Sequence, residues 1–286
     1  WFSRKSAIFS AGLRDMDAIL GRDDRLVAKL TSAVEKLDVS FAAIIGTPVP
    51  AVIGTDYKAL GRMTEKKTGL PVLTIDTNGM DLYDRGQEKA WLALFKKFAV
   101  DELPVKKGRV GIIGATPQDL SDLSAGDRLR QIFAADGKKA VCYGMGDGLD
   151  AVKQAASAEY NLVVSPSALE TAKYLQKQFG TPYVVGYPLV KTMLPEADYT
   201  GKKVLIVHQQ VMANALREEL KMRGASEVKV CSWFDLKPEL REEDDVYLKE
   251  EDDFTELAAD SKWDVVIADD CMKSMLPKFD GQFIGI

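Results

Sequence analysis

The sequence predicts an α/β protein built of Rossmann-like units, in which parallel sheets are flanked by helices. Apolar runs of four or five residues alternate with segments of helical periodicity along most of the 286-residue chain. Strands that alternate with helices in this way form parallel sheets covered on both faces. Most runs end in a loop of small or hydroxyl residues, as at residues 41–56, where a strand feeds a loop and then a helix.

The first predicted unit covers residues 1–104 and is expected to be truncated at its start, because the sequence begins at Trp1. A short apolar segment at 17–20 precedes its first helix. The predicted strands are 41–45 and 71–75, and the predicted helices are 25–37, 57–68 and 87–98.

After each of two linkers, 103–108 and 186–201, the alternation of strands and helices begins again. This defines a middle unit at 105–188 and a last unit at 189–286. The last unit is expected to continue past Ile286, which lies on a predicted strand. The middle unit has predicted strands at 109–113, 139–143, 161–164 and 183–185, and predicted helices at 126–135, 149–158 and from the cap at 165–167 to 179. The last unit has predicted strands at 203–207, 228–232, 265–268 and 283–286, and predicted helices at 212–223 and 254–259.

Composition excludes several classes of function. The net charge of −5 argues against a nucleic-acid surface, which needs clustered Lys and Arg. No apolar run is long enough to span a bilayer, and three scattered cysteines indicate a reducing cytoplasm. The acidic runs 242–245 and 250–253 are interpreted as a solvated loop and a helix N-terminus.

The loops that follow the strands are the candidate binding sites, because right-handed crossovers place them on one edge of each sheet. Free N–H groups at such edges suit anions and cofactors. The candidate cofactor-binding residues are Gly46, Thr47, Gly114, Thr116, Ser165, Ser167 and His208. The segment 144–148 is not a GxGxxG fingerprint, and the chain has no Walker A, GxSxG or HExxH motif.

Two cysteines are candidate metal ligands. Cys271 lies in a loop beside a predicted helix start, where a thiolate is favoured, and Cys142 lies near the end of a strand. The alternative for Cys142 is a core thiol, which is also the interpretation of Cys231 inside an apolar strand. His208 can be either a ligand or proton group or an ordinary residue at the sheet edge.

Eight segments, taken in order, resemble the nitrogenase component 1 family. They are 11–21 (AGLRDMDAILG), 44–56 (IIGTPVPAVIGTD), 71–86, 110–114 (VGIIG), 158–165 (AEYNLVVS), 179–183 (FGTPY), 201–206 and 263–269. The family includes the molybdenum–iron protein subunits, their assembly scaffolds and the dark-operative protochlorophyllide reductases.

The resemblance implies three Rossmann-like domains around a metal-cluster cavity, pairing into homo- or hetero-oligomers, and electrons from an ATP-dependent iron–sulfur partner. It also implies an iron–sulfur cluster, with one cysteine ligand in the loop after strand 41–45. That position is Pro48 here, which has no donor atom for iron. The family's cofactor-ligand motif has no match at Cys142, which is followed by Tyr-Gly-Met. The substrate is therefore expected to differ from dinitrogen.

The first functional hypothesis is an oxidoreductase subunit of the component 1 type that accepts electrons from the ATP-dependent reductase, with its substrate unknown. The alternative is a non-catalytic scaffold or binding protein for a metallocofactor, tetrapyrrole or other anion. An enzyme acting on nucleotides or sugars is a third possibility. The sequence leaves open whether the chain is an enzyme and whether it binds any cluster.

Overall fold

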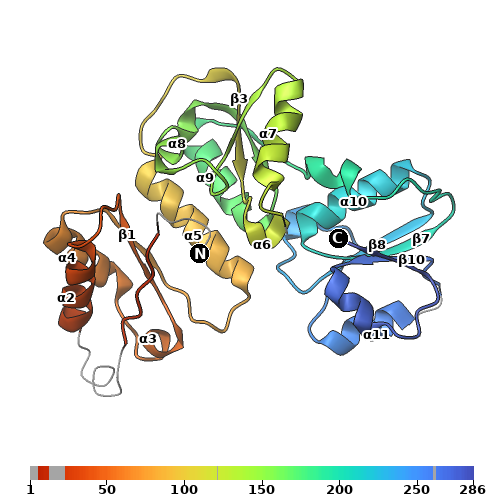
Figure 1. The fold of residues 1–286 in the computed structure, drawn as a ribbon, viewed down its shortest axis with the longest axis horizontal. Helices are drawn as coiled ribbons and strands as arrows, with labels where there is room; N and C mark the ends of the chain where they lie inside the picture. Colours follow the sequence, from red (N-terminus) through yellow and green to blue (C-terminus); the bar gives the residue numbers. More distant parts are fainter. Residues whose placement is uncertain (1–5, 13–22, 121, 260–261) are drawn as a thin grey trace. The chain divides into compact units, whose positions relative to one another are not determined.

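The computed structural model describes residues 6–12, 23–120, 122–259 and 262–286. The chain divides into two compact units, residues 1–97 and 98–286 (Figure 1). Parallel strands flanked by helices form both units, which confirms the predicted fold class. The apolar segment predicted at 17–20 lies outside the described residues.

The first unit contains a two-stranded parallel sheet, in which Ala42 pairs with Val72 and Ile45 with Ile75. Its elements are α2 (Asp23–Val34), β1 (Ala42–Ile45), α3 (Pro48–Val52), α4 (Tyr57–Thr68), β2 (Val72–Ile75) and α5 (Tyr83–Phe98). Alternate residues of β1 face opposite ways: Ile44 is buried in the core with residues of α2 and α4, whereas Ile45 is 63% exposed. The prediction that both faces are covered is therefore wrong for this strand.

The second unit begins with a four-stranded parallel sheet in the order β4-β3-β5-β6. Its elements are β3 (Lys106–Ile113), α6 (Pro117–Leu120), α7 (Ala125–Ala135), β4 (Lys139–Cys142), α8 (Leu149–Lys153), η1 (Ala155–Ser157), β5 (Ala158–Val163), η2 (Pro166–Ala168), α9 (Leu169–Phe179), β6 (Tyr183–Val185) and η3 (Pro188–Thr192).

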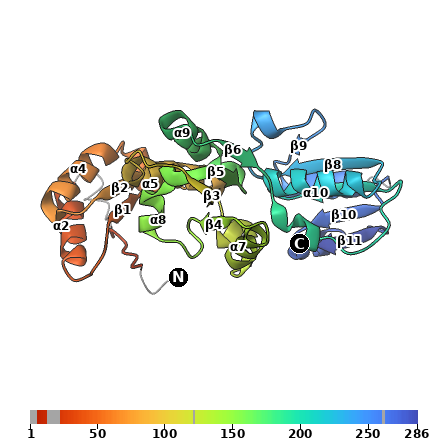
Figure 2. The ribbon, with the colours of Figure 1, turned by 90° about the horizontal axis from the view of Figure 1, so that it is seen from above.

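A five-stranded parallel sheet follows in the order β11-β10-β7-β8-β9 (Figure 2). Its elements are β7 (Lys203–Val207), α10 (Gln210–Met222), β8 (Glu227–Ser232), η4 (Pro238–Leu240), β9 (Val246–Tyr247), α11 (Glu251–Ala259), β10 (Val265–Ala268), η5 (Asp270–Met275) and β11 (Gln282–Gly285). The three sheets fall one in each predicted unit, while the boundaries at 104 and 188 stay a prediction.

The side chains of β7 point alternately to the two faces of the last sheet, and apolar residues cover both faces. Ile206 packs in the core on the α10 side, whereas Leu205 packs with Phe254 of α11 on the other side. The α10-side core continues without a break into the middle sheet, through Tyr187 and Leu189 of the connecting segment. Continuous apolar burial of this kind makes residues 98–286 a single unit.

Several element boundaries differ from the predictions. Helix 149–158 ends at Lys153 because β5 begins at Ala158, and helix 87–98 begins at Tyr83 instead. Three short elements, α3, α6 and β9, follow from no periodicity in the sequence. In the part of the chain that the structure describes, no helix has the length and apolar character needed to cross a membrane.

Candidate functional site

The loop after β1 is fixed by a close approach of backbone at Gly46. A Cβ atom at Gly46 would lie 2.3 Å from the carbonyl oxygen of Thr77 and 2.6 Å from the hydroxyl of Tyr57, so no side chain fits there. The Thr77 hydroxyl donates a 2.7 Å hydrogen bond to the Gly46 carbonyl oxygen. The loops after β1 and β2 are therefore joined at their start.

Pro48 is the first residue of α3, a position where its missing N–H leaves no unmade hydrogen bond. Its ring packs on the backbone of Gly79, since a Cβ there would lie 2.7 Å from the Pro48 Cδ. Asp56 caps α4 by accepting a 2.9 Å hydrogen bond from the Ala59 N–H. The helix start predicted at Gly54 and Asp56 is confirmed.

A groove of about 630 Å³ opens beside this loop, entirely within the first unit. We call it the α2–α4 groove. Its apolar walls include Leu26, Leu30, Ile44, Val49 and Ile53, and its polar lining is Ser10, Asp23, Lys29, Thr47, Thr55 and Tyr57. This volume and this mainly apolar lining are typical of small-molecule sites.

Tyr57 is the most perturbed polar group of the α2–α4 groove. Its hydroxyl oxygen is buried, and no hydrogen bond to it is present among the described residues. Burial is the main cause that raises the pKa of Tyr57; the nearby Thr47 backbone opposes it, and the charge of Asp76 adds a smaller rise. Tyr57 is therefore a neutral hydroxyl at pH 7, able to donate to a bound molecule.

In the middle sheet, the structure brings together Gly114, which follows β3, and Ser165, which follows β5. The strand order of the sheet reverses between these two strands, a position where ligands bind in sheets of this kind. Gly114 has φ +91°, and a Cβ on it would lie 2.8 Å from the Ala168 Cβ and 3.1 Å from the Ser165 nitrogen. The hydroxyls of Ser165 and Ser167 lie 3.0 Å apart and are buried. Thr116 is used locally, since its hydroxyl accepts from the Asp119 N–H.

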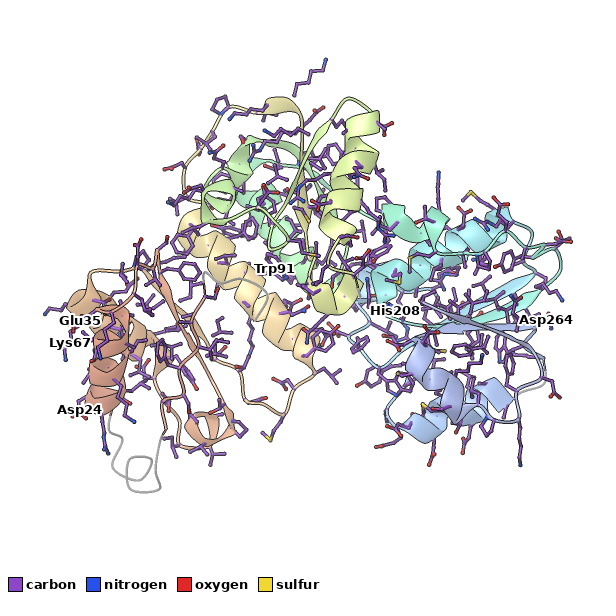
Figure 3. All side chains as sticks on the ribbon, in the orientation of Figure 1. Asp24, Glu35, Lys67, Trp91, His208 and Asp264 are labelled. Carbon is purple, nitrogen blue, oxygen red and sulfur yellow. The ribbon has the colours of Figure 1, made fainter. Side chains whose placement is uncertain are left out.

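At the corresponding edge of the last sheet, His208 follows β7 (Figure 3). Asp269 follows the adjacent strand β10. The His208 Nδ1 atom is buried and has no hydrogen-bond partner in the described ranges. Burial lowers the pKa of His208 to about 4, against a smaller opposing effect of Asp269. His208 is therefore a neutral imidazole at pH 7.

Gln209 connects the two sheet edges, and sequence reasoning missed it. Its Nε2 donates a 3.0 Å hydrogen bond to the carbonyl oxygen of Val164, at the end of β5. Its Oε1 accepts from the Val211 N–H at the start of α10. The end of β5 and the start of α10 are thus linked through the side chain of Gln209.

The cysteines do not form a thiolate cluster. Cys142 and Cys231 are buried, and desolvation raises the pKa of each thiol to about 12. Cys271 is exposed, and the pKa of its thiol is raised chiefly by a hydrogen bond to Asp269. Across the described residues, no group of three His, Cys, Asp or Glu side chains is placed to hold a metal ion.

These donors do not fit the iron–sulfur cluster that the resemblance implies. Cluster ligation needs several thiolates, and the ring of Pro48 fills the position of the expected cysteine by packing on Gly79. The cysteines of the described residues therefore provide no set of thiolates for such a cluster. The predicted ligands Cys142 and Cys271 stay a prediction, with Cys142 placed in the core.

The fold defines a class: α/β proteins whose Rossmann-like sheets are joined by short connections. Residues 1–190 match the family model described as Nitrogenase component 1 type Oxidoreductase. The chain therefore belongs to the nitrogenase component 1 family. This agrees with the resemblance noted in the sequence.

One curated relative is the nitrogenase iron-molybdenum cofactor biosynthesis protein NifE of Clostridium pasteurianum. It is 26% identical over 179 residues, which is 62% of this chain but 38% of that protein. Two solved structures, titled nitrogenase Cp1 at pH 6.5 and at pH 5, match with TM-scores of 0.73 and 0.71. They cover 96% and 97% of this chain, and 74% and 71% of theirs, at 13% and 15% identity. These structural matches show a shared fold.

Proposed function

We propose that this chain is a binding or scaffold subunit of the component 1 type, which holds a largely apolar molecule in the α2–α4 groove. The observation that carries this proposal is the groove itself, about 630 Å³ of mainly apolar lining at the loop that carries Pro48. The similarity to a relative named as a cofactor biosynthesis protein supports handling of a cofactor or precursor. The proposed setting is the cytoplasm.

The groove offers a mixed chemistry to its occupant. Val49 and Ile53 provide apolar contact, while the hydroxyls of Thr47 and Tyr57 can hydrogen-bond a polar edge. Lys29 supplies a positive charge, and its ammonium donates one of its three N–H groups to the Ala11 carbonyl oxygen. A planar apolar molecule with a carboxylate, such as a porphyrin, combines these features.

A pair of tryptophan substitutions on α3 tests the proposal. Val49 lines the groove, whereas Val52, on the same short helix, is 81% exposed and does not. Protoporphyrin IX is the probe, followed by thermal denaturation and fluorescence. At ten times its Kd a ligand stabilises the folded state by about 1.4 kcal/mol. We expect that shift in the native chain and in Val52→Trp, and its loss in Val49→Trp.

Equal shifts in both variants would place binding elsewhere. If neither protoporphyrin IX nor metal-free precursors changed the melting temperature of the native chain, the proposal would be refuted. The Val52→Trp variant controls for the effect of a new indole on the stability of α3.

A second candidate function is an electron-accepting oxidoreductase subunit that works with a component 1-like partner and an ATP-dependent iron–sulfur reductase. The description of the matching family as an oxidoreductase favours it. The exposed side chains of Ile45, Val49 and Val52 give the first unit an apolar surface that suits a partner subunit.

The second candidate is tested by anaerobic co-purification with candidate component 1-like partners. Iron and sulfide are measured in the complex, and reduction of the metal by the reductase is followed with and without ATP. ATP-dependent reduction would support an electron-transfer role. A complex without iron and sulfide would rule it out.

A further inference from the structure

The last sheet carries a second pocket, far from the strand ends already described. It has a volume of about 470 Å³ and is lined by Thr255, Ala258, Ala259, Trp263, Met275, Leu276, Pro277, Lys278, Phe279, Asp280 and Gly281. Trp263 lies two residues before the start of β10 and Gly281 directly precedes β11, so the pocket lies at the amino end of these strands. In Figure 3, Asp264 marks this end of the sheet and His208 the opposite one. We call it the Trp263 pocket.

Two aromatic side chains shape the Trp263 pocket. The indole N–H of Trp263 already donates a 2.9 Å hydrogen bond to the Leu257 carbonyl oxygen, so the ring presents apolar surface. Phe279 folds back on the chain, since a Cβ on Gly281 would lie 2.4 Å from its Cζ atom. A glycine at 281 is therefore what allows the phenyl ring to close this side of the pocket.

Two residues of opposite charge flank Phe279 in the sequence. Lys278 and Asp280 both line the pocket and are exposed. Neither side chain forms a hydrogen bond or ion pair with another described residue. A bound molecule thus meets an apolar wall together with one ammonium and one carboxylate that no other described residue pairs.

We propose that the Trp263 pocket binds a free amino acid with an apolar side chain. The side chain would lie against Trp263 and Phe279, the carboxylate near Lys278 and the ammonium near Asp280. A plain carboxylate would be attracted by the lysine but repelled by the aspartate, and a plain amine would meet the reverse. A zwitterion satisfies both charges, and the pocket volume lies within the range of small-molecule sites. This site is independent of the α2–α4 groove.

The test compares three ligands by isothermal titration of the full chain: phenylalanine, 3-phenylpropionate and phenethylamine. We expect a Kd on the order of 0.1–1 mM for phenylalanine. An exposed ion pair contributes up to about 1 kcal/mol, so each analogue should bind about fivefold more weakly. Equal affinity for all three ligands, or no binding of phenylalanine, would overturn the proposal.

Variants locate the site. Thr255→Trp fills the pocket from α11 and should abolish binding, whereas Glu256→Trp adds the same ring at the next, exposed position, which does not line it. Lys278→Gln should weaken 3-phenylpropionate about fivefold and leave phenethylamine no weaker, and Asp280→Asn should do the reverse. These rim changes keep the test valid if Thr255→Trp fails to fold. Unchanged binding in Thr255→Trp would also refute the site.

Discussion

The buried ion pair between Arg217 and Asp245 gives the sharpest test of how the last sheet is held together. The side chain of Arg217 is 3% exposed and that of Asp245 is fully buried. The guanidinium donates to both carboxylate oxygens, and the Glu242 N–H donates to one of them at 2.9 Å. Arg217→Met would leave a buried carboxylate without its counter-charge, which costs about 3–5 kcal/mol.

Urea denaturation followed by tryptophan fluorescence measures this cost. With an m-value of about 2 kcal/mol/M, a loss of 4 kcal/mol lowers the midpoint by about 2 M. The matched control is Lys221→Met on the same helix, whose partner Glu242 lies 3.3 Å away and is exposed, as is Lys221. That change should stay within about 0.5 kcal/mol. If Arg217→Met lowered the midpoint no more than the control, the pair would not be desolvated and the reasoning would fail.

Three further predictions follow. His208 has a folded pKa of about 4, below its unfolded value of 6.5, so its contribution is complete above pH 6.5 and is lost as the pH falls towards 4. His208→Gln should remove at most about 3 kcal/mol of that pH dependence, seen as the difference between the two denaturation profiles. Gly114→Ala should destabilise by about 2–4 kcal/mol because of its positive φ and the nearby Ala168, whereas Gly137→Ala, which meets open space, should cost about 1–2 kcal/mol in thermal melts. Iodoacetamide should label Cys271 alone in the native chain and all three thiols in urea, as counted by mass spectrometry; two native labels would contradict the burial of the others.

Periodicity predicts the fold well where burial is two-sided. In β7 and β10, runs of apolar residues predict strands that the structure buries on both faces. The same pattern is misleading at Ile45, because an apolar residue in a strand does not reveal whether a helix or a second sheet packs over it. Two prolines make 48–52 look like a loop, although Pro48 at the first position is compatible with a helix.

The candidate site is less predictable because its contacts join residues far apart in the sequence. The rule that strand ends share an edge places Gly114 near Ser165, and the structure confirms that proximity. Gln209 gives no signal, since a neutral amide has no charge or metal-ligand pattern. The acidic run 242–245 is interpreted as solvated, which is wrong for Asp245, because its partner Arg217 lies 28 positions earlier.

The loop after β1 keeps the geometry of a strand-end site without a metal-ligating side chain at Pro48. The backbone joint at Gly46 and Thr77, and the cap of α4 at Asp56, hold the geometry of a strand-end site. Pro48 removes the donor atom that the family resemblance would place there, and its ring supports the loop through packing on Gly79 instead. What the loop then presents is the apolar and hydroxyl surface of the α2–α4 groove. Because apolar walls gain affinity from burial and not from ligation, this surface suits a bound molecule better than a bare cluster.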